Sequence, residues 1–339
     1  MRIIRTNVLV LAAAVAVVVG FGLGGLPRAW AGTFPMQQFN VIVLGAPATG
    51  GSRTPVTSFN DNSDTQGNAF LNGSVAGSTF AGNGLPTGAT IGLEATGDVT
   101  SSNVHVDNGK VLLGGTATGG FSVNSGGSLT QNSTAPATDL ANFANELTAT
   151  STAWAALPTT TGATVTASNN NLTFNLPTAP SLVVFNIDAS TFSPGQSISN
   201  IAFSTLSANQ QVLINFSGTS FSEPSGLNFN GNSTEADNIV WNFSTATTLS
   251  LQSGWYGSIL APNATLSTQS TITGNLAVGG ISSVGEIDLA SPNFTTPLNA
   301  IPAGGPLPAP STWALLFCGG LGLGGLALGR RKAADKYSA

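Results

Sequence analysis

Charged side chains are scarce in this sequence of 339 residues. They make up 7% of the chain, against roughly 25% in ordinary globular domains. Between residues 32 and 308 the only basic residues are Arg53 and Lys110, whereas all 14 acidic residues except Asp335 lie there. Two positive and thirteen negative charges give this range a net charge of −11. Because nucleic-acid binding needs Lys and Arg to neutralise phosphates, nucleic acid is excluded as a partner.

Cysteine and histidine are nearly absent as well. The single cysteine, Cys318, rules out an intrachain disulfide, so stability must come from packing and hydrogen bonds. The single histidine, His105, stands two residues before Asp107, but no serine carries a nucleophile signature that would complete a catalytic triad. We expect a structural or surface histidine, no metal site and no cofactor.

Glycine, serine, threonine and asparagine supply the polar surface that charge does not. The chain has 42 glycines, and its apolar content of 41% argues against disorder. Short apolar runs alternate with Gly, Pro, Ser and Asn, and glycine at such corners allows turns with positive φ. This composition is typical of stacked β-coils with many turns.

One pattern recurs in residues 181–289. Asn186, Asn215 and Asn242 each stand in a short run of large apolar, β-favouring residues, at spacings of 29 and 27 residues. Asparagines at one place in successive coils can form a ladder of side-chain amides. The sequence therefore predicts a mainly-β fold, a β-solenoid resembling a parallel β-helix.

Residues 138–157 depart from the β pattern. Apolar residues with helical spacing predict one amphipathic helix, packed along the β-body. Thr138 or Asp139 is placed to cap its start, and Pro158 should end it. The residues with this spacing are Leu140, Phe143, Ala144 and Leu147.

Two further elements are expected around this helix. Residues 164–166 and 172–174 flank three consecutive asparagines and predict a β-hairpin. Residues 39–45 form an apolar run ended by glycine, which we interpret as the first strand, capping the solenoid.

The N-terminal end has the pattern of an export signal. Arg2 and Arg5 precede an almost wholly apolar stretch at residues 8–26, and Ala29, Trp30 and Ala31 form an A-x-A cleavage site. The mature chain is expected to begin at Gly32. An uncleaved membrane anchor is the alternative, for which the apolar stretch is barely long enough.

The C-terminal end has the layout of a membrane-sorting tail. Residues 313–328 are apolar and rich in Gly and Leu; as a helix they would span roughly 24 Å, less than a bilayer core of about 30 Å. The basic cluster that follows would stay in the cytoplasm. It consists of Arg330, Arg331 and Lys332. A plain membrane anchor is the alternative to a processed tail.

Several motifs together resemble the choice-of-anchor A family. They include FNVIVLG at residues 39–45, VFNIDAS at residues 184–190 and GSILAPNAT at residues 257–265, the most specific of the set. The resemblance covers residues 39–298. It implies a bacterial surface domain that is joined to different anchors in different proteins and has no established catalytic residues.

The tail resembles a PEP-CTERM sorting signal, which an exosortase-type membrane protease processes. Ala309 stands where that motif has glutamate, which is a departure from the pattern. The segment corresponding to the motif consists of Pro308, Ala309, Pro310, Ser311, Thr312 and Trp313. The expected organisation is a signal peptide (1–31), an extracellular β-domain (32–300), a linker with sorting motif (301–312), a transmembrane helix (313–329) and a cytoplasmic tail (330–339).

Three pairs of carboxylates leave an enzymatic alternative open. β-solenoids can host glycoside hydrolases, which use two carboxyl groups, and the last two pairs could also bind Ca²⁺. The simpler interpretation is solvated surface or turn residues. The pairs are Asp61 with Asp64, Glu235 with Asp237, and Glu286 with Asp288.

A run of hydroxyl residues suggests a binding face near the C-terminal coils. Rows of Thr and Ser on a solenoid can order water and bind ice or sugar polymers, although most such stretches are only the polar face of a sheet. The predicted face consists of Thr265, Thr268, Thr271 and Thr273, with Ser267 and Ser270.

We therefore predict a non-enzymatic structural or adhesion protein, exported by a Gram-negative-type bacterium to the cell surface or an exopolysaccharide matrix. Its expected partners are an exosortase-type protease, the inner membrane as a transient anchor, and exopolysaccharide or other surface polymers. The alternatives are a carbohydrate-active enzyme using a carboxylate pair, and an ice-binding or polysaccharide-binding β-solenoid.

Overall fold

The computed structural model describes residues 34–48, 52–81, 84–85, 89–118, 121–178, 180–192, 198–204, 206, 210–224, 226–229, 233–283 and 285–288. The predicted signal peptide, sorting motif, transmembrane helix and basic cluster lie outside these residues, as does Cys318. Among the residues that are described, no helix is both long and apolar enough to cross a membrane.

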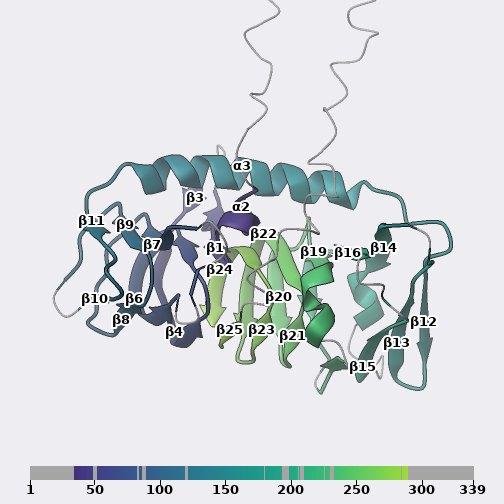
Figure 1. The fold of residues 1–339 in the computed structure, drawn as a ribbon. Coiled ribbons are helices and arrows are strands. Elements are labelled where there is room, and N and C mark those ends of the chain that lie inside the picture. The colour runs from purple at the N-terminus through teal and green to yellow at the C-terminus, as the bar shows by residue number, and fades with distance from the viewer. Residues whose placement is uncertain are drawn as a thin grey trace, which may run out of the picture. The chain divides into compact units, whose positions relative to one another are not determined.

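The described residues form a mainly-β parallel solenoid flanked by one long helix, which confirms the predicted fold class (Figure 1). All neighbours in its largest sheet pair in parallel. In spatial order these strands are β11 (Leu129–Thr130), β9 (Lys110–Leu113), β7 (Ile91–Ala95), β5 (Ala69–Leu71), β1 (Val41–Val43), β24 (Leu276–Ser283), β22 (Ser258–Thr268), β19 (Ile239–Asn242), β16 (Gln211–Ser217) and β14 (Leu182–Asp188).

The chain builds this solenoid from its centre. The first half runs outward from β1 to β11, helix α3 (Ala135–Ala155) returns along the sheet, and the second half runs inward from β14 to β24. Strand β1 pairs with β5 on one side and β24 on the other. The prediction that residues 39–45 cap the solenoid is therefore wrong, because both edges of β1 are satisfied by neighbouring strands.

Two smaller sheets form the side away from α3. The seven-stranded sheet also joins the two halves, through β25 beside β4 at Ile287 and Thr65. Its strands are β10 (Ser122–Val123), β8 (Val104–Val106), β6 (Gly73–Phe80), β4 (Val56–Thr65), β25 (Ile287–Asp288), β23 (Ile272–Thr273) and β21 (Trp255–Tyr256). The four-stranded sheet consists of β12 (Thr164–Ser168), β13 (Asn171–Asn175), β15 (Asn200–Phe203) and β18 (Asn228–Phe229).

The remaining elements are short. Strands β17 (Ser220–Ser222) and β20 (Thr248–Leu251) extend the large sheet beside the second half of β22. A two-stranded ribbon consists of β2 (Ala46–Pro47) and β3 (Arg53–Thr54). The short helices are α2 (Pro35–Gln38), η2 (Ala189–Phe192) and η3 (Ser233–Asn238).

The predicted hairpin is confirmed as β12 and β13, which pair in antiparallel register. Its turn consists of Asn169 and Asn170, with φ of 50° and 63°. Asparagine tolerates this left-handed conformation, and two such residues match the twist of a tight hairpin.

Helix α3 begins earlier than the sequence predicts. Thr138 and Asp139 lie inside the helix, so neither caps it, and Thr134 occupies the cap position without a side-chain hydrogen bond. Proline at the first turn is compatible with helical φ, and Pro136 allows this earlier start. The predicted apolar face is confirmed: Phe143, Ala144 and Leu147 are buried, and Leu140 packs against the same cluster.

The predicted asparagine ladder is confirmed and has a second role. Asn242 Nδ2 donates to Asn215 Oδ1 (2.8 Å), and Asn215 Nδ2 donates to Asn186 Oδ1 (2.9 Å). The same three amides donate to backbone oxygens of or just beyond α3. These acceptors are Ser151 O (2.9 Å), Trp154 O (2.8 Å) and Leu157 O (2.9 Å).

The acceptors are three residues apart, and the spacing explains why they fit. Three helical residues rise about 4.5 Å, close to the separation of about 4.8 Å between adjacent strands. One amide per coil therefore meets the carbonyl of every third residue from Ser151 to Leu157. The ladder joins the second half of the solenoid to α3.

Aromatic side chains fill the coils of the second half. Phe216 and Phe243 stack with ring centroids 4.6 Å apart, and Trp241 and Trp255 lie 5.0 Å apart. Gly257, with φ of +103°, makes room for this packing, because a Cβ there would lie 2.7 Å from the Trp241 indole nitrogen. The predicted glycine corners are thus confirmed where the core is most crowded.

Arg53 clamps the centre of the solenoid. Its guanidinium donates to Pro262 O (2.6 Å), Gly45 O (3.3 Å), Thr148 Oγ1 (3.0 Å) and Asn263 Oδ1 (3.3 Å). These acceptors belong to both halves of the chain and to α3. Burial lowers the pKa of Arg53, and the four acceptors named above are uncharged.

Candidate functional site

Two rows of hydroxyl side chains cross neighbouring strands, the first over β17, β20 and β22 and the second over these three strands and β24. In the first row Ser220 pairs with Thr248, and Thr248 pairs with Thr265. The second row lies two residues further along β17, β20 and β22; on β24 the residue opposite Thr265 is Gly280, and a register shift precedes Ser283. This row consists of Ser222, Ser250, Ser267 and Ser283. We call Ser220, Ser222, Thr248, Ser250, Thr265, Ser267 and Ser283 the hydroxyl face.

Alternation along the strands explains why these side chains point outward. Between the two rows lie Phe221, Leu249 and Leu266, which are buried in the core. Because successive side chains on a strand point to opposite faces, the flanking Ser and Thr face away from the core. Adjacent hydroxyl groups are thus about 4.8 Å apart along the solenoid, and the rows are about 6.7 Å apart.

Hydrogen bonds hold parts of this face in place. Ser267 Oγ lies 2.9 Å from Ser283 Oγ, so these two hydroxyl groups bond across β22 and β24. The buried carboxylate of Glu223 accepts the backbone N–H groups of Gln252 (2.7 Å) and Ser253 (3.2 Å), which fixes the corner after β20 against β17. Burial raises the pKa of Glu223, while these hydrogen bonds act in the opposite direction.

The first half of the chain continues the face in shorter form. Val75, Val99 and Ala117 are joined by isolated parallel β-bridges. They correspond to the row of buried residues that lies between the two hydroxyl rows of the second half. Thr116 and Thr118 flank Ala117 and are exposed, and strand β4 of this half contacts β24. Hydroxyl groups therefore occur on this side of both halves of the solenoid.

The four threonines predicted as a binding face are divided by the fold. Thr265 belongs to the hydroxyl face, but Thr268 is 2% exposed and its Oγ1 accepts the N–H of Ser270 (3.1 Å) at a corner. Thr273 is in β23, and Thr271 immediately precedes that strand, so both lie on the seven-stranded sheet. The chain turns a corner after β22, and consecutive threonines cannot share one face across it.

Sequence analysis missed the hydroxyl residues of β17 and β20. These are Ser220, Ser222, Thr248 and Ser250. The signal was present as S-F-S and T-L-S-L, an alternation of hydroxyl and apolar residues. Recognising it required knowing that β20 pairs with β22 and that β17 pairs with β20.

Two of the predicted carboxylate pairs contribute to one acidic cluster. Asp64 on β4 is brought beside Glu286 and Asp288 by the pairing of β4 with β25. Burial, followed by the charges of Glu286 and Asp64, raises the pKa of Asp288 to about 6. Burial and then Glu286 also raise the pKa of Asp64. The structure does not describe the side chains of Asp61 and Glu235.

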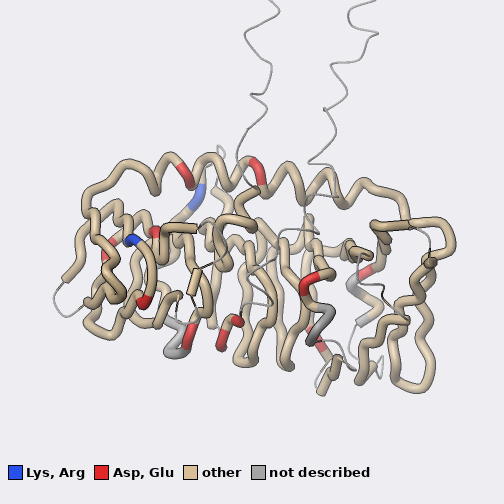
Figure 2. Tube along the Cα trace, in the orientation of Figure 1, with Lys and Arg blue, Asp and Glu red and all other residues tan. Residues whose placement is uncertain are grey.

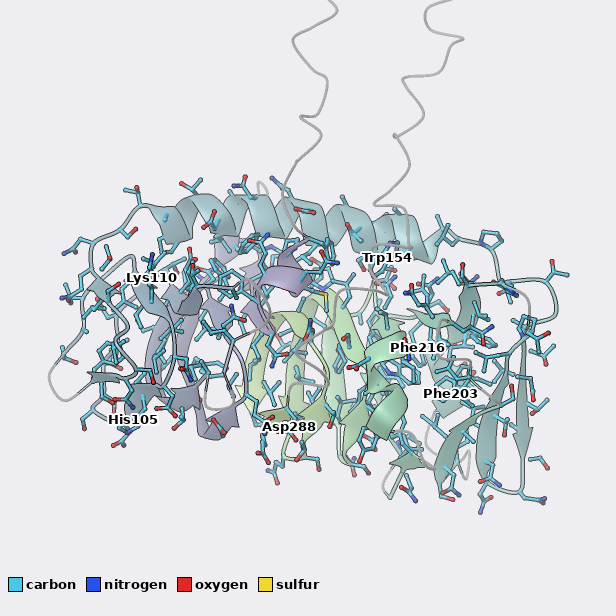
Figure 3. All side chains as sticks on the ribbon, in the orientation of Figure 1. His105, Lys110, Trp154, Phe203, Phe216 and Asp288 are labelled. Atoms are coloured by element: carbon cyan, nitrogen blue, oxygen red, sulfur yellow. The ribbon has the colours of Figure 1, made fainter. Side chains whose placement is uncertain are left out.

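His105 lies on the same sheet, and Figure 3 shows His105 and Asp288 on the side of the solenoid opposite Trp154. His105 is exposed, and its Nδ1 lies 2.6 Å from Ser122 Oγ. Asp107 Oδ1 instead accepts a hydrogen bond from Asn124 Nδ2 (2.7 Å). Within the described ranges no carboxylate bonds to this imidazole, so a serine and histidine meet without the third group of a triad.

The described part of the chain was also compared with the requirements of a metal site. No group of three His, Cys, Asp or Glu side chains there could hold a metal ion. Figure 2 shows few charged residues, distributed over several parts of the tube. The hydroxyl face is a regular arrangement of polar groups, which is suited to many weak, repeated contacts.

Comparison with known proteins agrees with this geometry. The family model described as "Putative Ice-binding-like adhesive domain" matches residues 33–289, which include every described strand. No significant match was found among curated proteins or among solved structures. The family indicates a surface or extracellular protein with an adhesion or binding function. The chain belongs to the family of ice-binding-like adhesive domains.

Proposed function

We propose that this protein is a non-enzymatic adhesion domain that binds an extended surface or matrix polysaccharide through the hydroxyl face. The observation that carries the proposal is the register of two hydroxyl rows over β17, β20 and β22, the second of which continues to Ser283 on β24. A regular array of this kind can hydrogen-bond, directly or through ordered water, to a ligand that repeats along the solenoid. Each contact is weak, and many act together.

We also propose how the domain reaches its place of action. Residues 1–31 act as a cleaved export signal, and residues 301–339 act as a sorting tail that an exosortase-type protease processes after transient insertion in the inner membrane. The resemblance to the choice-of-anchor A family and to PEP-CTERM signals supports this part. Mass spectrometry of the mature protein tests it: we expect Gly32 as the first residue and loss of the basic cluster.

The binding proposal predicts a face-specific loss of adhesion. Thr248→Tyr places a bulky ring in the middle of the exposed first row and should weaken retention on immobilised bacterial polysaccharides at least tenfold, since it lifts the ligand from neighbouring hydroxyl groups. Thr166→Tyr is the matched control, because Thr166 is an exposed strand residue on β12, away from this face. Equal retention of both variants on every polymer would contradict the proposal.

Ice is a second candidate ligand for the same face. The hydroxyl rows and the family description both favour it, since rows of threonine and serine can order water. Thermal hysteresis abolished by Thr248→Tyr but not by Thr166→Tyr would assign ice as the ligand. The carboxylate cluster supports a third candidate, a glycoside hydrolase, for which turnover lost in Glu286→Gln would be required.

A further inference from the structure

The hydroxyl face offers no positive charge to a ligand. The two cations between residues 32 and 308 are Arg53 and Lys110. The Arg53 guanidinium already donates to four acceptors at the centre of the solenoid. Lys110 begins β9 and pairs there with Ile91 in the large sheet, in the part that α3 contacts. An anionic ligand would thus find no ion-pair partner on this face.

Carboxylates lie on the surfaces that continue from this face. Asp98 lies next to Val99 and its Oδ1 accepts the N–H of Thr116 (2.6 Å), so a negative charge stands among the hydroxyl groups of the first half. Asp64 and Asp288 lie on the seven-stranded sheet that follows β22 around the corner. Like charges facing each other across an interface disfavour binding.

The face also lacks an aromatic platform. The aromatic residue of β17 is Phe221, and it is 2% exposed because it points into the core. The outward positions of β20 and β22 hold Ser and Thr. Binding on the described face therefore depends on hydroxyl groups, with one group of each row presented by β17, β20 and β22 and one of the second row by β24.

From these features we infer that the ligand of the hydroxyl face is an uncharged polysaccharide chain lying along the solenoid axis, across the strands rather than parallel to them. The inference rests on the proposed function and specifies its ligand. Along the axis a chain meets a new hydroxyl group about every 4.8 Å, whereas along one strand it meets only two. An anionic polymer is excluded by charge, and a short oligosaccharide contacts too few coils.

The test compares one polymer in two charge states. The full chain is incubated with microcrystalline cellulose, with curdlan, and with the same cellulose after surface carboxymethylation. We expect at least tenfold more protein on an unmodified polymer than on the carboxymethylated one at low salt. Retention on the unmodified polymer should change less than twofold between about 0.05 and 1 M NaCl, because no ion pair is screened.

A charge-introducing variant makes the test specific to the face. Thr248→Lys supplies a cation within the first row and should increase retention on carboxymethylated cellulose at low salt, whereas Thr166→Lys should not. Preferential binding of the unaltered chain to the carboxymethylated polymer, or absence of binding to both neutral polymers, would overturn the inference. Failure of the proposed function is distinguishable, since Thr248→Tyr would then leave retention on every polymer unchanged.

Discussion

The Asn215→Ala variant is expected to lose about 2 to 4 kcal/mol of unfolding free energy, measured by urea denaturation at pH 7. The Asn215 side chain is 4% exposed and takes part in three hydrogen bonds, to Asn186, Asn242 and the Trp154 carbonyl oxygen. Removing it leaves buried amide groups of its neighbours without a partner, and each such group costs about 1 to 3 kcal/mol. It also loosens α3 from the sheet.

The outer end of the ladder provides the matched control. Asn186 is exposed, so water can replace its bonds to Asn215 and Leu157, and Asn186→Ala should cost about 1 kcal/mol or less. Equal destabilisation by the two variants would show that the ladder does not act as a buried network. A small effect of both would show that apolar packing alone holds the helix.

Stability should fall as the pH rises because of Glu94. This residue is 0% exposed and occupies the row that faces α3, and burial and then the charge of Asp139 raise its pKa to about 8. In the unfolded chain its pKa is ordinary, near 4.5. The unfolding free energy therefore has its full value below pH 4.5. It falls as the pH rises from 4.5 to about 8, by at most about 1.4 kcal/mol per pH unit, because the unfolded chain releases this proton before the folded chain does.

Thermal unfolding between pH 6.5 and 8 measures this effect most cleanly. The corresponding loss from Asp288, whose pKa is raised to about 6, is nearly complete at lower pH. Glu94→Gln should flatten the dependence in this window, and Asp139→Asn should reduce it by removing the repelling charge. A slope in Glu94→Gln as steep as in the unaltered chain would rule out Glu94 as its source.

Local patterns in the sequence predicted the elements whose form depends on near neighbours. The two asparagines at positions 169 and 170 specify the hairpin turn, and the spacing of Phe143, Ala144 and Leu147 specifies the buried face of α3. The ladder was predictable because Asn215 and Asn242 each stand at the same place in a similar apolar run. In these cases a few consecutive residues determine the geometry.

The order of the coils was not predictable in the same way. Strand β1 pairs with β24 although more than 200 residues separate them. The residues of a parallel strand do not distinguish a place in the middle of the sheet from a place at its edge. The acidic cluster was not predictable for the same reason. Asp64 lies near Asp288 only because β4 pairs with β25, which joins the two halves of the solenoid in the seven-stranded sheet. The hydroxyl face was found in part, at Thr265 and Ser267 of β22, because its other strands come from different coils.

Thiol labelling on two faces tests the central claim, that the hydroxyl face contacts the ligand. In a Cys318→Ser background, Ser250→Cys places a thiol on this face and Thr273→Cys places one on the seven-stranded sheet, both at half-buried positions. Labelling rates are measured for the free protein and for the protein bound to the polymer that retains it. We predict at least tenfold slower labelling of the Ser250→Cys thiol on binding and an unchanged rate for the Thr273→Cys thiol; the opposite pattern would contradict the claim.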